Sequence, residues 1–360
     1  MTLTVRKLTP EWEALYDAFV RKAESAQFFA SLKYRDLLKE FLGPTVEDHY
    51  FIAVDQGGLI KGVLPSFILK MEGAGPIANS LPFYGSNGGA IVEPGDRQTV
   101  ALLLTHFHDF TVNLCCSSST VVTSPFELHL DVYEETLKPT YKDSRIGQLT
   151  SLPNAAGVPE EVVMAALHHK TRNMVRKAIK QGVQVRDDLW DGCLDFVTST
   201  HADNMRVIGG RAKPPQFFRM VERLFDYGND YKVFTAWINN KPVAALLLFY
   251  YNGFVEYFTP VIIAEYRTSQ PLSLSIFTAM ADAITNGYRW WNWGGTWHTQ
   301  DGVYQFKRSW GAIDKPYEYF INIGDDNILR QDKEQLLNNA PYFYVAPFSK
   351  FVKNSGDFQR

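Results

Sequence analysis

Hydrophobic and polar positions in the first 130 residues alternate between two spacings. Apolar residues three and four positions apart are typical of amphipathic helices, whereas β-branched and aromatic runs bounded by glycine and proline are typical of strands. Helices are predicted after Pro10, over 31–41 and over 97–110, and strands over 50–54, 59–70 and 120–123.

The second half of the chain repeats that order of elements. Helices are predicted within 158–181 and over 189–205, 214–227 and 271–284, and strands over 183–185, 231–238, 243–250, 254–259 and 288–293. The halves share this pattern without visible identity of letters. Each is therefore predicted to be a mixed, mostly antiparallel α/β sheet flanked by helices. We place the domains at 1–140 and 141–325, with a C-terminal tail over 326–360.

Composition indicates a well-packed globular protein. The 360 residues are 46% hydrophobic and only 21% charged, which excludes a disordered chain, a coiled coil and a collagen-like repeat. The formal net charge of −3 argues against a bulk electrostatic grip on nucleic acid, but it leaves room for a local basic patch.

Cysteine spacing and hydropathy narrow the class further. Cys115 and Cys116 are adjacent and Cys193 stands alone, so no CxxC pair exists and we expect no metal site. The longest apolar run, 243–251, is shorter than the roughly 18 residues that span a bilayer. The sequence opens without a signal-peptide pattern. We therefore expect a cytoplasmic protein with no tightly bound cofactor.

A basic helix is the first local feature that can carry chemistry. Lys170, Arg172, Arg176, Lys177 and Lys180 fall within eleven residues with no acid among them. Arg172, Arg176 and Lys180 recur every four positions and form one stripe. Such a stripe is either a solvated helix face or a surface for an anionic ligand, which would relieve the repulsion.

Two later segments add candidates. Gly209-Gly210 is predicted to place Arg206 and Arg211 on a loop between helices, where arginines can clamp a carboxylate or phosphate. A plain connection is the alternative. Further on, a tryptophan-rich strand ends in Gly294-Gly295 and leads to a short helix that carries Lys307. The alternative there is a core edge with an incidental lysine.

Two motifs connect the chain to a known family. Residues 172–183 follow R-x-x-x-R-K-A-x-x-x-G-V, and residues 302–311 follow G-x-x-x-F-K-x-x-W-G. Together with the block over 253–296 they closely resemble the C-terminal half of the FemAB-like acyltransferases, which are tandem members of the GNAT superfamily. LPFYGSNGG at 81–89 resembles the glycine- and aromatic-rich motif of their N-terminal half. The resemblance covers about residues 30–320.

The resemblance implies a fold of two tandem GNAT-like domains and an amide-forming reaction. The family transfers acyl or aminoacyl groups to amines of peptidoglycan precursors or other cell-envelope glycans. The resemblance also implies that Lys307 contacts the substrate and that Arg211 lies where the family binds its anionic acceptor. Glu256 lies mid-strand where GNAT enzymes often place a base; a solvated strand face is the alternative. The predicted catalytic residues are Lys307, Glu256 and Tyr257, and the predicted substrate-binding residues are Arg211, Arg206, Tyr84, Asn87, Arg267, Trp293, Arg172 and Arg176.

The donor stays open between acyl-CoA and aminoacyl-tRNA. The interval 189–231 is too short for the long helical hairpin of many interpeptide-bridge members, although shorter members still use aminoacyl-tRNA. The loop over 267–272 lacks the glycines of the usual acetyl-CoA loop, and Pro271 has no N–H. The predicted partners are a glycan or peptidoglycan precursor, with tRNA and a peripheral membrane contact as further options. Two other functions stay open: an acyl-CoA-dependent N-acyltransferase on a free amino sugar or small amine, and a non-catalytic module that binds a nucleotide sugar.

Overall fold

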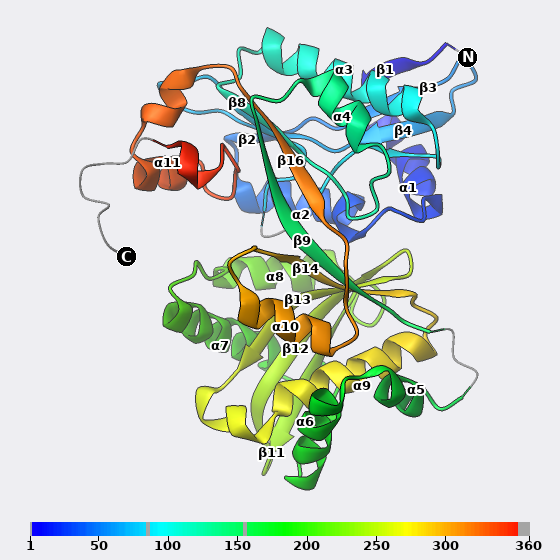
Figure 1. Ribbon diagram of the computed structural model, residues 1–360, viewed down its shortest axis with the longest axis vertical. Coiled ribbons are helices and arrows are strands. Elements are labelled where there is room, and N and C mark those ends of the chain that lie inside the picture. The colour runs from blue at the N-terminus through cyan, green and yellow to red at the C-terminus, as the bar shows by residue number, and fades with distance from the viewer. Residues whose placement is uncertain (1, 84–86, 154–156, 352–360) are drawn as a thin grey trace. The chain divides into compact units, whose positions relative to one another are not determined.

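The chain divides into two compact units in the computed structural model, which describes residues 2–83, 87–153 and 157–351 (Figure 1). Unit 1 comprises Met1–Arg145 together with Pro316–Arg360, and unit 2 comprises Ile146–Lys315. The sequence analysis places the second boundary at 325 and treats 326–360 as a separate tail. In the structure residues 316–360 belong to unit 1. Strand β16 (Tyr317–Ile323) pairs with β8 (Ser118–Val122), and further along the tail Tyr344 O accepts from Asn79 Nδ2 at 2.9 Å and Val345 O accepts from Ser118 Oγ at 2.7 Å. Sequence periodicity carries no information on this long-range pairing.

Unit 1 contains two sheets. One has the strand order β1-β3-β4-β7, and the other runs β9-β16-β8-β6-β5-β2 with the first residues of β9. Strands β6 and β8 are parallel, and helix α3 lies between them in the chain. The described elements of unit 1 are β1 (Thr4–Lys7), α1 (Glu13–Lys22), α2 (Leu32–Leu42), β2 (Val46–Asp48), β3 (Phe51–Val54), β4 (Ile60–Leu64), β5 (Phe67–Leu69), β6 (Ile77–Asn79), β7 (Ile91–Val92), α3 (Arg97–Asn113), β8, α4 (Leu130–Leu137), β9 (Tyr141–Ser151), β16, α11 (Lys333–Asn339) and short 3₁₀ helices at Pro10–Trp12, Phe28–Ala30, Asp326–Arg330 and Phe348–Lys350.

Unit 2 is built on one sheet with the order β10-β11-β12-β13-β14-β9, and β15 adds to β9. Its strands are antiparallel except for the pair β13–β14, which is parallel and is joined through α9. Its described elements are α5 (Pro159–Ala166), α6 (His169–Lys180), β10 (Gln184–Arg186), α7 (Cys193–Ile208), α8 (Pro215–Leu224), β11 (Tyr231–Ile238), β12 (Lys241–Tyr251), β13 (Phe254–Ile262), a 3₁₀ helix at Ala264–Ser269, α9 (Pro271–Thr285), β14 (Trp290–Thr296), α10 (Asp301–Ser309) and β15 (Ile313–Asp314).

Each unit therefore contains one parallel strand pair, and the two strands of that pair are connected through a helix. The predicted mixed, mostly antiparallel sheets with flanking helices are confirmed. One prediction of detail is wrong: the single strand expected over 59–70 is broken at Pro65-Ser66 into β4 and β5. Proline lacks the N–H that a strand ladder requires.

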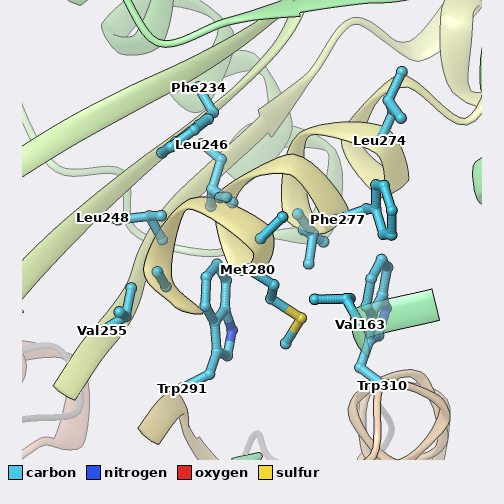
Figure 2. Close-up of a cluster of buried hydrophobic side chains, with 14 of the residues drawn as sticks. Val163, Phe234, Leu246, Leu248, Val255, Leu274, Phe277, Met280, Trp291 and Trp310 are labelled. Carbon is cyan, nitrogen blue, oxygen red and sulfur yellow. The ribbon is translucent and has the colours of Figure 1, made fainter. Parts of the chain in front are cut away.

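The core of unit 2 surrounds α9 (Figure 2). Most of this helix is apolar and buried, as expected of a helix covered on several sides. Phe277 and Met280 project among side chains of β12, β14 and α10, including Leu246, Trp291 and Trp310. This packing fixes the ends of β13 and β14 relative to α10.

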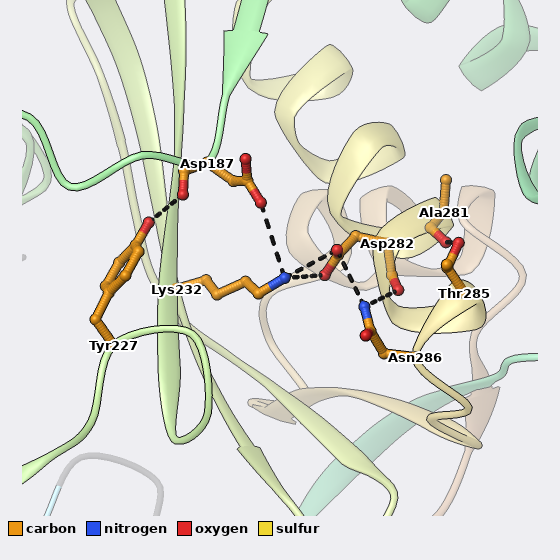
Figure 3. Close-up of polar contacts among 7 residues, drawn as sticks. All are labelled: Asp187, Tyr227, Lys232, Ala281, Asp282, Thr285 and Asn286. Carbon is orange, nitrogen blue, oxygen red and sulfur yellow. Dashed lines mark hydrogen bonds and ion pairs between the residues drawn. The ribbon is translucent and has the colours of Figure 1, made fainter.

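A polar cluster ties β11 to α9 (Figure 3). The Lys232 ammonium donates to both carboxylate oxygens of Asp282 at 2.9 Å, and Asp187 lies 3.8 Å away. Asn286 donates to the Asp282 carboxylate at 3.1 Å. Lys232 and Asp282 are partly buried, and their charge-assisted bonds satisfy both charges.

Candidate functional site

The parallel strands β13 and β14 separate part-way along their length. They pair only from Phe254–Trp290 to Glu256–Asn292. Beyond that point β14 bulges at Trp293-Gly294 before it pairs with β9 again, and Gly294 has a left-handed φ of +71° that glycine adopts without strain. On β13, Phe258 is the extra residue of a second bulge. A bulge leaves backbone groups outside the ladder, so both strands depart from regular pairing where they part.

The carboxyl group of Glu256 lies at this separation and is buried. Glu256 is only 3% exposed. The alternative that it lies on a solvated strand face is therefore excluded. Oε2 accepts a 2.7 Å hydrogen bond from Asn292 Nδ2, whereas Oε1 has no hydrogen-bond partner among the described residues. Burial raises the pKa of Glu256 to about 8, and the Asn292 hydrogen bond opposes that rise. The group can therefore exchange a proton near neutral pH.

Asn292 and Lys307 continue the polar network to the end of β14. Asn292 Oδ1 accepts from the Gly294 N–H at 2.9 Å. Lys307, on α10, is 5% exposed, and its ammonium donates to Gly294 O at 3.2 Å, Gly295 O at 3.3 Å and Thr296 Oγ1 at 2.8 Å. Burial lowers the pKa of Lys307 to about 8. All three ammonium hydrogens thus bind β14.

Aromatic rings cover the other side of the separated strands. The Tyr257 and Trp293 rings have centroids 4.9 Å apart, and Trp293 also lies 6.0 Å from Trp310. Trp293 is buried, and its Nε1 donates to Thr150 Oγ1 at 2.9 Å. Burial raises the pKa of the Tyr257 phenol. The structure therefore brings Glu256, Tyr257, Trp293 and Lys307 into one region of unit 2.

Of the two arginines predicted to lie on a loop, only Arg211 does so. Arg206 lies in the last turn of α7, where it is exposed and pairs with Asp203 at 3.0 Å. The helix ends after it, at Gly209 with a φ of +69°. The prediction of a loop position for Arg206 is thus wrong, because helix α7 persists to the glycine pair. Arg211 does lie in the connection to α8 and is exposed.

Of the remaining predicted residues, those in the described ranges lie outside β13, β14 and α10. Arg267 is exposed in the 3₁₀ helix before α9. Arg172 donates to Leu167 O at 2.9 Å, whereas Arg176 is exposed on α6. In unit 1, Asn87 is buried and donates to Gln27 Oε1 at 2.9 Å. Tyr84 lies outside the described residues.

A buried lysine and histidine beside β13 were not anticipated from the sequence. Lys213 is 8% exposed, and its ammonium lies 4.8 Å from the ring centre of Phe258, the extra residue of the β13 bulge. Its backbone N–H donates to His201 Nε2 at 3.1 Å. Burial lowers the pKa of Lys213 to about 8 and that of His201 to about 4. The only sequence signal is a lysine between Ala212 and Pro214-Pro215, which does not distinguish an inward from an outward side chain.

Within residues 2–83, 87–153 and 157–351, no group of three His, Cys, Asp or Glu side chains is arranged to hold a metal ion. None of the helices in these ranges has the length and hydropathy needed to cross a membrane.

Comparisons with known proteins concern the fold of the chain and the class of its second unit. Residues 168–308, within unit 2, match the family model of the acetyltransferase (GNAT) domain, which confirms the predicted acyltransferase class for that domain. The crystal structure of FemX has a TM-score of 0.69 at 13% identity, covering 88% of this chain and 96% of its own. A tandem GNAT protein from the clavulanic acid biosynthesis pathway has a TM-score of 0.55 at 13% identity, covering 90% and 99%.

A third solved structure has a similar fold. The C-terminal domain of a putative lysylphosphatidylglycerol synthetase from Agrobacterium fabrum has a TM-score of 0.55 at 11% identity, covering 93% of this chain and 98% of its own. No curated protein matches the sequence. At these identities the likeness concerns the fold. The chain therefore has the fold of tandem GNAT proteins, and residues 168–308 in its second unit match an acetyltransferase (GNAT) domain.

Proposed function

We propose that the chain transfers an acyl or aminoacyl group from an activated donor to an amine of a cell-envelope glycan or peptidoglycan precursor in the cytoplasm. The observation that carries this proposal is the parting of β13 and β14 immediately beyond Glu256, whose buried carboxyl keeps one oxygen without a hydrogen-bond partner among the described residues. An activated ester or thioester needs no enzyme nucleophile. It needs positioning, a proton acceptor and stabilisation of an oxyanion.

These three requirements have candidates in unit 2. Holding the amine against the donor carbonyl can supply roughly 7–11 kcal/mol. Backbone N–H groups of β13 beyond Glu256, where β14 no longer pairs with it, are the candidates to receive the oxyanion. An alkyl ammonium with a pKa near 10.4 costs about 4.6 kcal/mol to deprotonate at pH 7, and Glu256 in its carboxylate form can accept that proton. Since the pKa of Glu256 is about 8, the carboxylate fraction grows as the pH rises towards and past that value.

We propose acyl-CoA as the first donor to test and aminoacyl-tRNA as the second. GNAT proteins use acyl-CoA, and the N-terminus of α9 is the first α-helix terminus after β13, separated from it by the 3₁₀ helix at Ala264–Ser269. Pro271 removes one N–H at that terminus, but Leu272 and Ser273 retain theirs, and a helix N-terminus attracts phosphate. Arg267 precedes the helix. The similarity to FemX and to a lysylphosphatidylglycerol synthetase domain keeps the aminoacyl ester as the second donor class.

The test is a transfer assay read by mass spectrometry. The purified chain is incubated with acetyl-CoA, longer acyl-CoAs or aminoacyl-tRNAs, together with a UDP-linked peptidoglycan precursor or a free amino sugar. A mass increase of the acceptor by one acyl or aminoacyl group supports the proposal. An increase only on the free amino sugar would identify the small-amine N-acyltransferase instead. Binding of the nucleotide sugar without turnover under any donor would overturn the transferase proposal in favour of a binding module.

A further inference from the structure

Unit 1 contains a groove at the C-terminal end of α3. Its volume is about 730 Å³, within the range of about 300–1,000 Å³ typical of small-molecule sites. The walls come from the end of α3, the turn at 115–117, residues 138–140 and the end of β16 (Figure 1 shows α3 and β16). None of the lining residues belongs to the candidate transfer site of unit 2.

Hydrogen bonds hold the walls of this groove in place. Asn322 Nδ2 donates to Leu137 O at 2.8 Å and lies 3.3 Å from His108 Nδ1, while Asn322 Oδ1 accepts from the Thr140 N–H at 3.2 Å. One amide thus links β16 to α3 and to residues 138–140. On the opposite wall, the Ser117 N–H donates to Pro76 O at 2.8 Å and its carbonyl accepts from Gly324 at 3.0 Å. The groove is therefore formed before any ligand arrives.

Two glycines allow backbone segments of this chain to approach the turn at 115–117 closely. A side chain on Gly75 would approach Cys115 O to 2.3 Å and Ser117 Oγ to 2.9 Å. A side chain on Gly324 would approach Cys116 O to 2.2 Å. Cys115 itself has a left-handed φ of +52°, which is unusual for a residue with a side chain. The turn is thus fixed from both sides in a conformation that a free turn would avoid.

The groove offers hydrogen-bond donors that the protein does not use. Ser117 is fully buried, and its hydroxyl has no partner among the described residues. Lys138 is exposed, and across the described ranges its ammonium makes no ion pair. His108 Nδ1 faces the Asn322 amide N–H, which leaves the proton of the neutral imidazole on Nε2. By contrast, the Asp325 carboxylate already accepts the Asn327 N–H at 3.0 Å.

We propose that this groove binds a small, hydroxyl-rich organic phosphate such as a sugar phosphate. A phosphate group presents three acceptor oxygens, which match the lysine ammonium, the serine hydroxyl and the imidazole N–H. Lys138 supplies a compact point charge for it. The hydroxyls of Thr111 and Ser119, which also line the groove, can bind the sugar hydroxyls. The proposal goes beyond the transfer reaction and does not rest on it.

The thiol of Cys115 can report on binding in this groove. Cys115 is exposed and lines the groove, whereas Cys116 and Cys193 are buried. Burial raises the pKa of both buried thiols to about 11, and the thiolate is the form that reacts. Iodoacetamide at about pH 8 should therefore alkylate Cys115 first. A ligand in the groove should shield it.

The experiment measures the rate of Cys115 alkylation by peptide mass spectrometry. With glucose 6-phosphate at ten times its Kd, the rate should fall about tenfold by simple mass action. Glucose or inorganic phosphate at the same concentration should change it less than about twofold. Ser117→Ala and Lys138→Met should each weaken protection about tenfold or more, whereas the control Lys22→Met, an exposed lysine of α1, should leave protection unchanged.

Three results would overturn the proposal. The first is no protection of the wild-type thiol by glucose 6-phosphate up to about 10 mM. The second is equal protection by inorganic phosphate, which would indicate an anion site without a sugar. The third is protection that survives in both Lys138→Met and Ser117→Ala, because the ligand would then lie elsewhere. Thermal melting of each variant shows whether it is folded, and Lys138→Met changes only an exposed side chain.

Discussion

Replacing Glu256 by glutamine should stabilise the protein while it removes transfer activity. The side chain keeps its shape, and the glutamine carbonyl can still accept the bond from Asn292. Its amide then occupies the position of Oε1, which has no partner among the described residues. The substitution therefore removes the charge without changing the number of unmet hydrogen bonds. What changes is the dependence of stability on pH.

The size of that change follows from the pKa. Unfolded Glu256 ionises near 4.5, whereas in the folded chain its pKa is about 8. The folded state therefore binds the proton more tightly, so the wild-type protein loses stability as the pH rises from about 4.5 to about 8. At about 1.4 kcal/mol per pKa unit, Glu256→Gln should exceed the wild type by about 1 kcal/mol at pH 5, about 3 at pH 7 and about 5 at pH 9.

Urea unfolding at these three pH values measures the difference directly. Glu222→Gln, an exposed carboxyl on α8, is the matched control and should stay within about 0.5 kcal/mol of the wild type throughout. In the transfer assay, loss of a general base should slow turnover about 10²- to 10⁴-fold. A stability difference that does not grow with pH would refute the burial argument. Unchanged turnover would show that Glu256 is not the base.

Other parts of the site and fold give further expected outcomes. The pKa of Lys307 is about 8, so wild-type activity should fall above about pH 8, where the ammonium loses its proton. Lys307→Met should slow transfer about 10²-fold and abolish that fall, because the ammonium that holds the end of β14 is gone; full activity with an unchanged pH profile would refute this. Charge reversal of Arg176 and Lys180 should weaken tRNA binding more at low salt than at high salt, and a fluorescence titration that finds no loss would favour a solvated helix face. Lys232→Met should lower the free energy of unfolding by about 1–3 kcal/mol, since Asp282 loses its partly buried ion partner; a urea transition at the wild-type midpoint would contradict it.

The order of the elements could be predicted because local signals agree with the fold. The Asn252-Gly253 turn has φ values of +48° and +81°, the conformation that an Asn-Gly hairpin requires, and β12 and β13 pair around it. Pro271 opens α9 as expected. The return of 316–323 to unit 1 could not be predicted, since it depends on partners almost 200 residues away.

The candidate site was predicted by residue type more reliably than by environment. Strand alternation puts Glu256 on the face of β13 opposite Tyr257, but it does not show that other elements cover that face as well. Burial of this carboxyl, and of Lys213 in a short connection, arises from tertiary packing. Arg206 and Arg211 look equivalent in the sequence, yet Arg206 lies within α7 and Arg211 lies in the connection after it.

The geometry of Lys307 favours a positioning role over direct contact with substrate. Its three donors are already bound to β14, and Gly294 connects that lysine through Asn292 to Glu256. The network therefore fixes the point at which the strands part. Burial opposes the charged form of both Glu256 and Lys307, and each raises the cost of folding by several kcal/mol at some pH. Apolar side chains of similar volume would avoid that cost. Two such groups joined through one network at a strand separation are better explained by a chemical task than by packing.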